Sequence, residues 1–203
     1  MNDVILFVLT AASAYLLGSL NFALLVSKFV FHMDIREHGS GNAGATNALR
    51  VVGAKWTVPI ALGDIAKGVA AVLLGSMLLG DYGRLLACLC AILGHIFPLY
   101  FGFRGGKGVI TTAAIIAVVD WRVFLLCISV FLVFVLIWRY VSLGSIAAAC
   151  CLPPVMWFFH PGDWKFTLTA LCITAVLVFV HRGNIQRLRT HTERKLTFRK
   201  KEE

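Results

Sequence analysis

Seven apolar stretches follow one another along the chain, and they constrain its fold more than any other feature. They lie at about residues 3–29, 56–80, 84–101, 108–120, 121–138, 140–159 and 164–181. Because a helix of about 20 apolar residues crosses the hydrocarbon core of a bilayer, this pattern predicts an all-α polytopic membrane protein with about seven transmembrane helices. The 108–120 stretch is the shortest, and we expect it to be tilted, broken or only half-spanning.

The composition excludes an ordinary soluble protein. Hydrophobic residues make up 59% of the 203 residues and charged residues only 14%, against about 45–50% and about 25% in soluble domains. The apolar stretches and one long connection occupy almost the whole length. We therefore expect residues 1–203 to form a single integral-membrane domain with a basic tail at 182–203.

The distribution of Lys and Arg predicts the orientation in the membrane. Fifteen of the 19 Lys and Arg residues fall in the tail or in connections on one predicted side. Because cytoplasmic segments carry the excess of basic residues, we predict a cytoplasmic C-terminus and, with an odd number of spans, an N-terminus outside. The net charge of +9 therefore indicates topology and contact with membrane lipid. Only Phe198 lies among the tail cations, so we expect no nucleic-acid partner.

The longest connection, about residues 31–55, contains a glycine-rich segment between Gly39 and Arg50. Successive N–H groups in such a loop form a concave anion-binding surface. The glycine spacing also fits a dinucleotide fingerprint, but no strand precedes it and no βαβ unit fits. A flexible turn does not need so many polar side chains together, so we interpret the segment as functional. Its candidate residues are Ser40, Gly41, Asn42, Thr46, Asn47 and Arg50.

A second glycine-rich segment, residues 94–108, lies on the same predicted face but does not match a P-loop. Its end opens the next apolar stretch. The N–H groups there, the positive end of a helix and the ammonium of Lys107 would converge on one anion. We therefore predict a phosphate site rather than a merely topogenic cation. Its residues are Gly105, Gly106, Lys107 and Gly108.

A third polar cluster begins where the last apolar stretch ends. If the helix continues, His181 and Asn184 lie on one face, and Arg187 is the i, i+3 neighbour of Asn184. From these residues alone, a binding site and a charged membrane anchor are equally good interpretations. Ser145, near the start of the 140–159 stretch, is equally open between contact with an anion and a hydrogen bond to its own helix.

The remaining reactive residues are interpreted as structural. Asp64 and Lys67 stand three residues apart inside an apolar stretch, where an ionisable pair is either functional or a structural ion pair, and we favour the ion pair. We expect His95 to be hydrogen-bonded near the membrane interface. The six cysteines lie in or beside apolar stretches without metal-ligand spacing, so we predict no metal and no cofactor.

The three clusters, in this order, resemble the three motifs of the bacterial acyl-phosphate-dependent glycerol-3-phosphate acyltransferases, the PlsY type. The matching segments are residues 39–47, 94–108 and 181–193, and the likeness covers essentially the whole chain. Two positions differ, since Arg104 stands where lysine is commoner and His191 where glycine is usual. The resemblance implies transfer of a fatty acyl group from acyl phosphate to glycerol 3-phosphate, giving lysophosphatidic acid and inorganic phosphate. It also implies a site that faces the cytoplasm from the bacterial inner membrane.

The resemblance further implies roles for individual residues. Phosphates and glycerol hydroxyls would be held by Ser40, Asn42, Asn47, Arg50, Lys107, Ser145, His181 and Asn184. We count Lys107, His181 and Ser40 as catalytic candidates. Acyl phosphate is already activated and no Ser or Cys has a recognisable neighbouring base, so we expect direct transfer without an acyl-enzyme. The remaining substrate-binding candidates are Gly41, Thr46, Gly105, Gly106, Gly108, Arg187 and Glu193.

A transporter or anion channel is the alternative function. Broken helices, glycines and helix N-termini directed at an anion are also features of transporters. An inverted repeat would favour that function, but the first glycine-rich segment has no counterpart in the second half of the chain. We therefore favour the acyltransferase.

Overall fold

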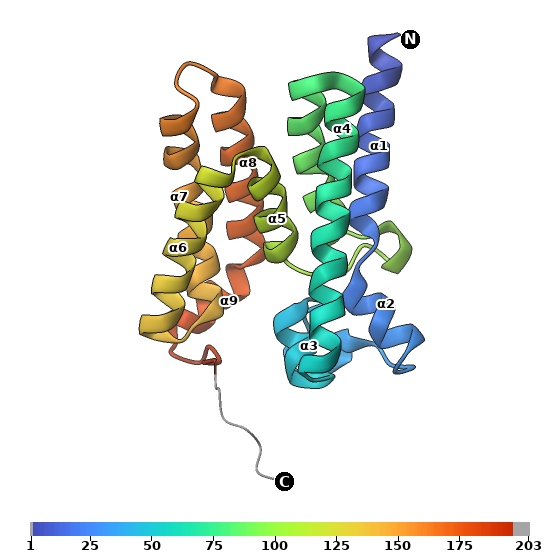
Figure 1. Ribbon diagram of the computed structural model, residues 1–203. Coiled ribbons are helices and arrows are strands. Elements are labelled where there is room, and N and C mark those ends of the chain that lie inside the picture. Colours follow the sequence, from blue (N-terminus) through green and yellow to red (C-terminus); the bar gives the residue numbers. More distant parts are fainter. Residues whose placement is uncertain (1, 197–203) are drawn as a thin grey trace. The chain divides into compact units, whose positions relative to one another are not determined.

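The computed structural model describes residues 2–196, and its regular elements there are all helices (Figure 1). This confirms the all-α class predicted from the sequence. The chain divides into two compact units, Met1–Trp121 (unit 1) and Arg122–Glu203 (unit 2). That the whole chain acts as a single membrane domain stays a prediction.

Unit 1 begins with a bent pair of helices rather than one straight helix. α1 (Asp3–Ser19) and α2 (Phe22–Phe29) meet at an angle of 44°. The buried side chain of Asn21 caps α2, because its Oδ1 accepts a hydrogen bond from Leu24 N at 3.1 Å. A single capping residue therefore breaks an otherwise continuous apolar stretch.

The predicted stretches 56–80 and 84–101 form the two arms of one helical hairpin, α4 (Ala54–Ile96). Leu79 and Gly80 leave the helical conformation, and Gly80 has a φ of +57°. The arms meet at Gly75 and Gly83, where a Cβ on either residue would collide with the other's carbonyl oxygen. Glycine at both positions therefore allows the backbones to touch.

Two loops leave the same end of this hairpin. The first contains η1 (Ile35–Glu37) and α3 (Ala45–Val51), and the second contains η2 (Leu99–Phe101) and leads into α5 (Val109–Val119). α4 packs against α1 and α5. A buried apolar cluster anchors the first loop to α2 and α4, and it contains Ala23, Leu24, Ile35, Ala43, Ala48 and Ile60.

Unit 2 is built from α6 (Trp121–Trp138), which begins at the unit boundary, α7 (Val141–Phe159), α8 (Trp164–Val180) and α9 (Arg182–Arg189). α7 and α8 pack along each other, and Thr174 Oγ1 donates to Ala149 O at 2.7 Å between them. α8 and α9 meet at 58°. This bend redirects the chain into the short polar helix that carries the third cluster.

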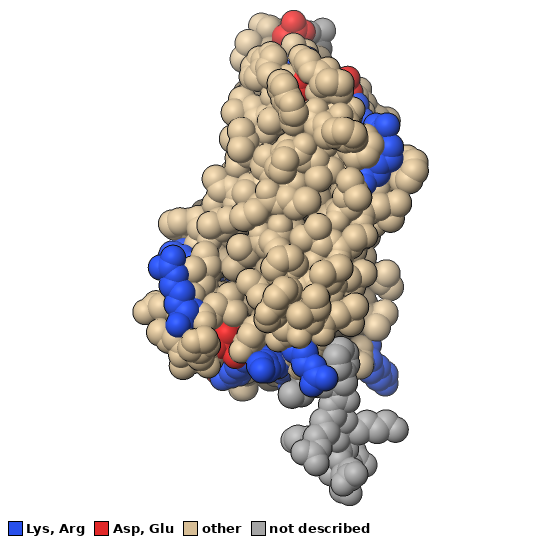
Figure 2. All heavy atoms as spheres, turned by 90° about the vertical axis from the view of Figure 1, so that its left-hand side faces the viewer, with Lys and Arg blue, Asp and Glu red and all other residues tan. Residues whose placement is uncertain are grey.

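The chain has the helices of a membrane protein. Three helical segments among residues 2–196 are long and apolar enough to cross a bilayer, and the two bent pairs bring the number to five if each crosses once. Most of the surface shown in Figure 2 is uncharged, and several Lys and Arg side chains gather along its lower edge. α5 is shorter, at 11 residues. The seven crossings and the orientation of the termini stay predictions.

Candidate functional site

The first glycine-rich loop is held in shape by one buried amide. Asn47, on α3, is 1% exposed. Its Oδ1 accepts from Ser40 N at 2.7 Å, and its Nδ2 donates to the carbonyls of Ile35 at 3.2 Å and His38 at 3.0 Å. Gly39 has a φ of +64°, and a Cβ there would collide with the Asn47 amide. Asn47 therefore organises the loop, and its predicted contact with substrate stays a prediction.

The other candidates of this loop lie nearer the surface. Ser40, Gly41 and Arg50 are exposed, whereas Asn42 and Thr46 are half-buried. The Ser40 N–H is bound by Asn47, and Ser40 as a residue is exposed. A ligand at this loop would therefore meet a rigid backbone carrying accessible polar side chains.

The second glycine-rich segment caps the end of α4. Gly105 N donates to Ile96 O at 3.0 Å, and Gly106 N donates to His95 O at 3.2 Å. These bonds satisfy carbonyls that a helix end leaves without an intrahelical partner. The two glycine N–H groups are thus directed at α4. The sequence predicts that N–H groups and Lys107 converge on one anion. The N–H groups that fit this prediction are those at the start of α5, next to half-buried Lys107.

The two glycine-rich loops touch each other within unit 1. A Cβ on Gly106 would collide with Ala43 O of the first loop and with the His95 ring. Ala43 O also accepts a hydrogen bond from Asn21 Nδ2 at 3.2 Å. The structure therefore brings together the first two predicted clusters, which lie at residues 39–50 and 94–108 of the sequence.

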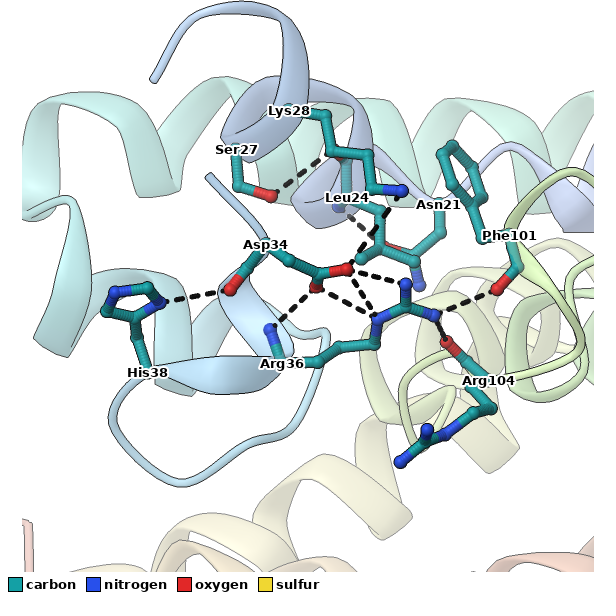
Figure 3. A network of polar contacts seen from close by, with 9 residues as sticks. All are labelled: Asn21, Leu24, Ser27, Lys28, Asp34, Arg36, His38, Phe101 and Arg104. Carbon is teal, nitrogen blue, oxygen red and sulfur yellow. Dashed lines mark hydrogen bonds and ion pairs between the residues drawn. The ribbon is translucent and has the colours of Figure 1, made fainter. Parts of the chain in front are cut away.

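A side chain that the sequence analysis did not single out ties these loops together. Arg36 Nη1 donates to Phe101 O at 2.8 Å and to Arg104 O at 2.9 Å, and its Nη2 contacts Asp34 Oδ2 at 2.6 Å (Figure 3). The Arg36 hydrogen bond lowers the pKa of Asp34 to about 2, and bonding to Asp34 raises the pKa of Arg36. Lys28 Nζ lies 4.0 Å from the same carboxylate. The only sequence signal was the short spacing between Asp34 and Arg36.

Beneath the loops lies a buried polar cluster. Lys67 Nζ lies 2.8 Å from Asp64 Oδ1, 2.9 Å from His95 Nδ1 and 2.8 Å from Leu20 O, to which it donates. Leu20 stands at the break between α1 and α2, and Thr111 Oγ1 of α5 donates to Asp64 O at 3.2 Å. The cluster thus joins both arms of α4 to α5 and to the break between α1 and α2. This arrangement agrees with the structural ion pair expected for Asp64 and Lys67.

In unit 2, Glu193 gathers the third cluster around one carboxylate. Its Oε1 accepts from Ser142 Oγ at 2.7 Å and from Asn184 Nδ2 at 2.6 Å, and its Oε2 accepts from Arg187 Nε at 2.7 Å. Partial burial raises the pKa of Glu193, but these hydrogen bonds outweigh burial and leave the pKa below its ordinary value. Asn184, Arg187 and Glu193 lie close together in the sequence, whereas Ser142 lies about 40 residues or more before them and joins the cluster only in the fold.

His181 and Ser145 are buried in the same unit. His181 is 2% exposed, and its Nδ1 lies 2.8 Å from Leu177 O. A carbonyl only accepts, so Nδ1 carries the proton and Nε2 is the basic nitrogen of the neutral ring. Ser145 Oγ donates to Val141 O at 2.9 Å. Ser145 therefore makes a hydrogen bond to its own helix, which is one of the two roles that the sequence left open for it.

Both units offer chemistry suited to anions. Unit 1 supplies a lysine just before the N-terminus of α5, next to the contact between the two glycine-rich loops, and unit 2 supplies a buried imidazole near a polar turn. Among residues 2–196, no group of three or more His, Cys, Asp or Glu is arranged to hold a metal ion. Lys, Arg, backbone N–H and amide groups are the groups of both units that suit the charge of an anion.

Comparison with known proteins decides the family. The sequence profile of the family described as "Glycerol-3-phosphate acyltransferase" matches residues 8–191. The chain belongs to this family. A glycerol-3-phosphate acyltransferase of Geobacillus kaustophilus is 43% identical over 183 residues, which cover 90% of this chain and 92% of that protein. One of Thermoanaerobacter sp. is 38% identical over 192 residues, covering 93% and 95%.

Two solved structures of one family member have the same fold. Both are of PlsY (YgiH), described as an integral membrane glycerol 3-phosphate acyltransferase. Its glycerol 3-phosphate form aligns with a TM-score of 0.87 at 35% identity and covers 94% of this chain and 96% of that chain. Its lysophosphatidic acid form aligns with a TM-score of 0.84 at 34% identity, covering 94% and 95%. The resemblance inferred from the three motifs is thereby confirmed.

Proposed function

We propose that this protein transfers a fatty acyl group from acyl phosphate to glycerol 3-phosphate, giving lysophosphatidic acid and inorganic phosphate. The reaction would be the first acylation of phospholipid synthesis. The observation that carries the proposal is the junction of the two glycine-rich loops beside Lys107 in an otherwise apolar helical protein. Such a junction suits a phosphate group on a substrate that also carries, or receives, a lipid chain.

Direct transfer is the mechanism we propose. A hydroxyl oxygen of glycerol 3-phosphate attacks the acyl carbonyl carbon, the bond from that carbon to the phosphate oxygen breaks, and inorganic phosphate leaves. The hydroxyl proton passes to a phosphate oxygen of the substrate, with His181 Nε2 as the second candidate base. Lys107 would neutralise charge on a phosphate, and Ser40 would hold one by hydrogen bonding.

The membrane arrangement is part of the proposal. We place the protein in the bacterial inner membrane with its N-terminus outside, its C-terminus cytoplasmic and its three clusters on the cytoplasmic side, following the excess of basic residues there. A thiol reagent that cannot cross membranes should label Cys introduced at position 82 or 162 from outside intact cells. It should miss Cys at position 38 or 189. The opposite labelling pattern would reverse the orientation.

Reconstitution tests the chemistry. The purified protein in lipid, given acyl phosphate and labelled glycerol 3-phosphate, should release lysophosphatidic acid and inorganic phosphate in equal amounts. Acyl-coenzyme A and acyl carrier protein thioester, offered separately, should not replace acyl phosphate. Activity with a thioester alone would overturn the proposed donor, and lack of activity with all three donors would overturn the reaction.

Mass spectrometry tests the absence of an acyl-enzyme. Protein held with acyl phosphate alone should gain no acyl mass, because direct transfer needs both substrates together. Protein treated with a reactive thiol-modifying lipid serves as a positive control for detection. A stoichiometric acyl adduct on Ser40 that glycerol 3-phosphate discharges would establish the two-step route instead.

A further inference from the structure

Arg36 spends most of its hydrogen-bonding capacity on protein groups in the two loops. Its Nε lies 2.9 and 3.1 Å from the two carboxylate oxygens of Asp34, and its Nη2 lies 2.6 Å from Asp34 Oδ2. Its Nη1 donates to Phe101 O and Arg104 O. Of the five N–H groups of a guanidinium, these bonds use four. The guanidinium group of Arg36 is therefore bound by Asp34 and by two backbone carbonyls of the protein.

The carbonyls that Arg36 holds belong to the turn that leads to Lys107. Phe101 N and Phe103 N both donate to Pro98 O, at 3.1 and 3.0 Å, and Phe103 has a left-handed φ of +57°. A phenylalanine is strained in that conformation, so surrounding contacts must fix it. Arg36 supplies such a contact from outside the turn, at carbonyls on both sides of Phe103.

The next two residues are held from the other side. Gly105 and Gly106 donate their N–H groups to Ile96 O and His95 O at the end of α4. The segment before Lys107 therefore lies between Arg36, which binds its carbonyls, and α4, which binds its amides. Its direction sets where the Lys107 side chain starts.

We propose that Arg36 is a positioning residue, oriented by Asp34, that holds Lys107 in register with the Ser40–Asn42 segment rather than binding a substrate phosphate. The expected effect on kinetics rests on the proposed function. The coupling between the two loops does not depend on that function. Arg36 and Ser40 share one loop that Asn47 makes rigid. A tie from Arg36 to the second loop therefore fixes the two candidate phosphate contacts relative to each other.

Kinetics of four variants test the positioning role. Arg36→Lys keeps the charge but cannot hold two carbonyls and a carboxylate at once. We expect about a 10-fold or larger loss of kcat/KM, with a raised KM for a phosphate substrate, in Arg36→Lys, Arg36→Gln and Asp34→Asn. Glu37→Gln, which removes a neighbouring exposed carboxylate of the same short helix, should behave like the wild type. Full activity in Arg36→Lys would show that charge alone matters and would overturn the proposal.

Chemical rescue separates shape from charge. In Arg36→Ala, added ethylguanidinium should restore part of the lost activity, because its planar fork can bridge Asp34 and the two carbonyls. Added ethylammonium of the same charge should not. Equal rescue by the two cations would indicate a charge effect on substrate binding and contradict positioning.

Hydrogen exchange tests the tie without any assay of activity. Amides of residues 98–108 should exchange about 10-fold faster in Arg36→Gln and Asp34→Asn than in wild type and Glu37→Gln. Amides of α7 serve as an internal control and should not change. Unchanged exchange in residues 98–108 would overturn the coupling. If instead the wild type transfers no acyl group while exchange responds as expected, the proposed function fails and the coupling stands.

Discussion

The polar clusters of the two units are held together by different contacts. In unit 1 the backbones of the two loops touch at Gly106 and Ala43, and the Arg36 side chain adds a tie between the loops. In unit 2 three side chains from α7 and α9 converge on the carboxylate of Glu193, beside backbone hydrogen bonds of the turn such as Thr192 N to Arg187 O. An added atom should therefore be most disruptive at the contact in unit 1, and loss of the carboxylate charge should be most disruptive in the turn of unit 2.

The largest effect is expected from adding a methyl group at the junction of the loops. In Gly106→Ala the new Cβ would meet Ala43 O and the His95 ring, so the loops must separate. We expect activity to fall about 100-fold or more, with loss of stability of several kcal/mol. Gly102→Ala is a control for an added Cβ without a collision: nothing lies within 4 Å of that Cβ, and the strain from the φ of +66° should have a smaller effect than the collision at Gly106. Similar activities of the two variants would contradict backbone contact as the cause.

Removing a side chain from the same region should leave the fold intact. In Lys107→Ala the backbone contacts of Gly105 and Gly106 remain, but a charge-assisted contact to phosphate is lost. That loss corresponds to about 1.5–3 kcal/mol, or roughly a 10- to 150-fold fall in activity. Circular dichroism in detergent should show the helix content of the wild type. Lys107→Arg should recover activity only in part, and near-normal turnover in Lys107→Ala would remove this lysine from the site.

In unit 2 the loss of charge should lower stability. Glu193→Gln weakens hydrogen bonds from Ser142, Asn184 and Arg187. We expect a loss of about 1.5–3 kcal/mol in the free energy of unfolding of this turn. Local unfolding can be followed by hydrogen exchange of residues 184–196, with residues 98–108 as the internal control. No change in the first segment would mean that the turn is stabilised by backbone contacts, as in unit 1.

Acid should have a smaller and graded effect on the same turn. Glu193 has a folded pKa below its ordinary value of 4.5, so its stabilising contribution is complete above pH 4.5 and is lost as the pH falls through the lower folded value. Protection of residues 184–196 should therefore fall in this acid range in the wild type. In Glu193→Gln the protection should be lower throughout and should lose this dependence on pH.

The smallest effect should come from His191. It follows α9 with a left-handed φ of +56°, a conformation that usually selects glycine after a helix. His191→Gly should relieve this strain and raise stability by about 0.5–1 kcal/mol. A lower melting temperature would show that a contact of the His191 imidazole stabilises the fold by more than the backbone strain destabilises it.

Local signals in the sequence predict much of this structure. The apolar stretches predict the helices, and the gap between residues 80 and 84 coincides with the turn of the α4 hairpin. The sequence also predicts a helix that begins after Gly108 and a polar cluster around Asn184. Each of these features depends on residues close together in the chain. The bend between α1 and α2 at Asn21 is a local feature that the sequence did not predict. A single polar residue in a long apolar stretch does not by itself indicate a break in the helix.

Contacts between distant residues account for what the sequence did not predict. His95 joins Asp64 and Lys67 from the other arm of the hairpin, and Arg36 reaches carbonyls 65 and 68 residues further on. A carbonyl is present at every residue, so the sequence does not mark which ones Arg36 binds. Asn47 adds a role that the sequence did not predict: its amide fixes the loop, and its predicted contact with a ligand stays a prediction.

The α4 hairpin also bears on how the chain enters the bilayer during synthesis. A charged residue at the centre of a single inserted helix is unfavourable by about 2.5–3.5 kcal/mol, and the first arm alone carries Asp64 and Lys67. Only the second arm brings His95 to them, and the arms touch at Gly75 and Gly83 close to the turn. We therefore expect the insertion machinery to release both arms into lipid together, with the polar cluster already assembled between them.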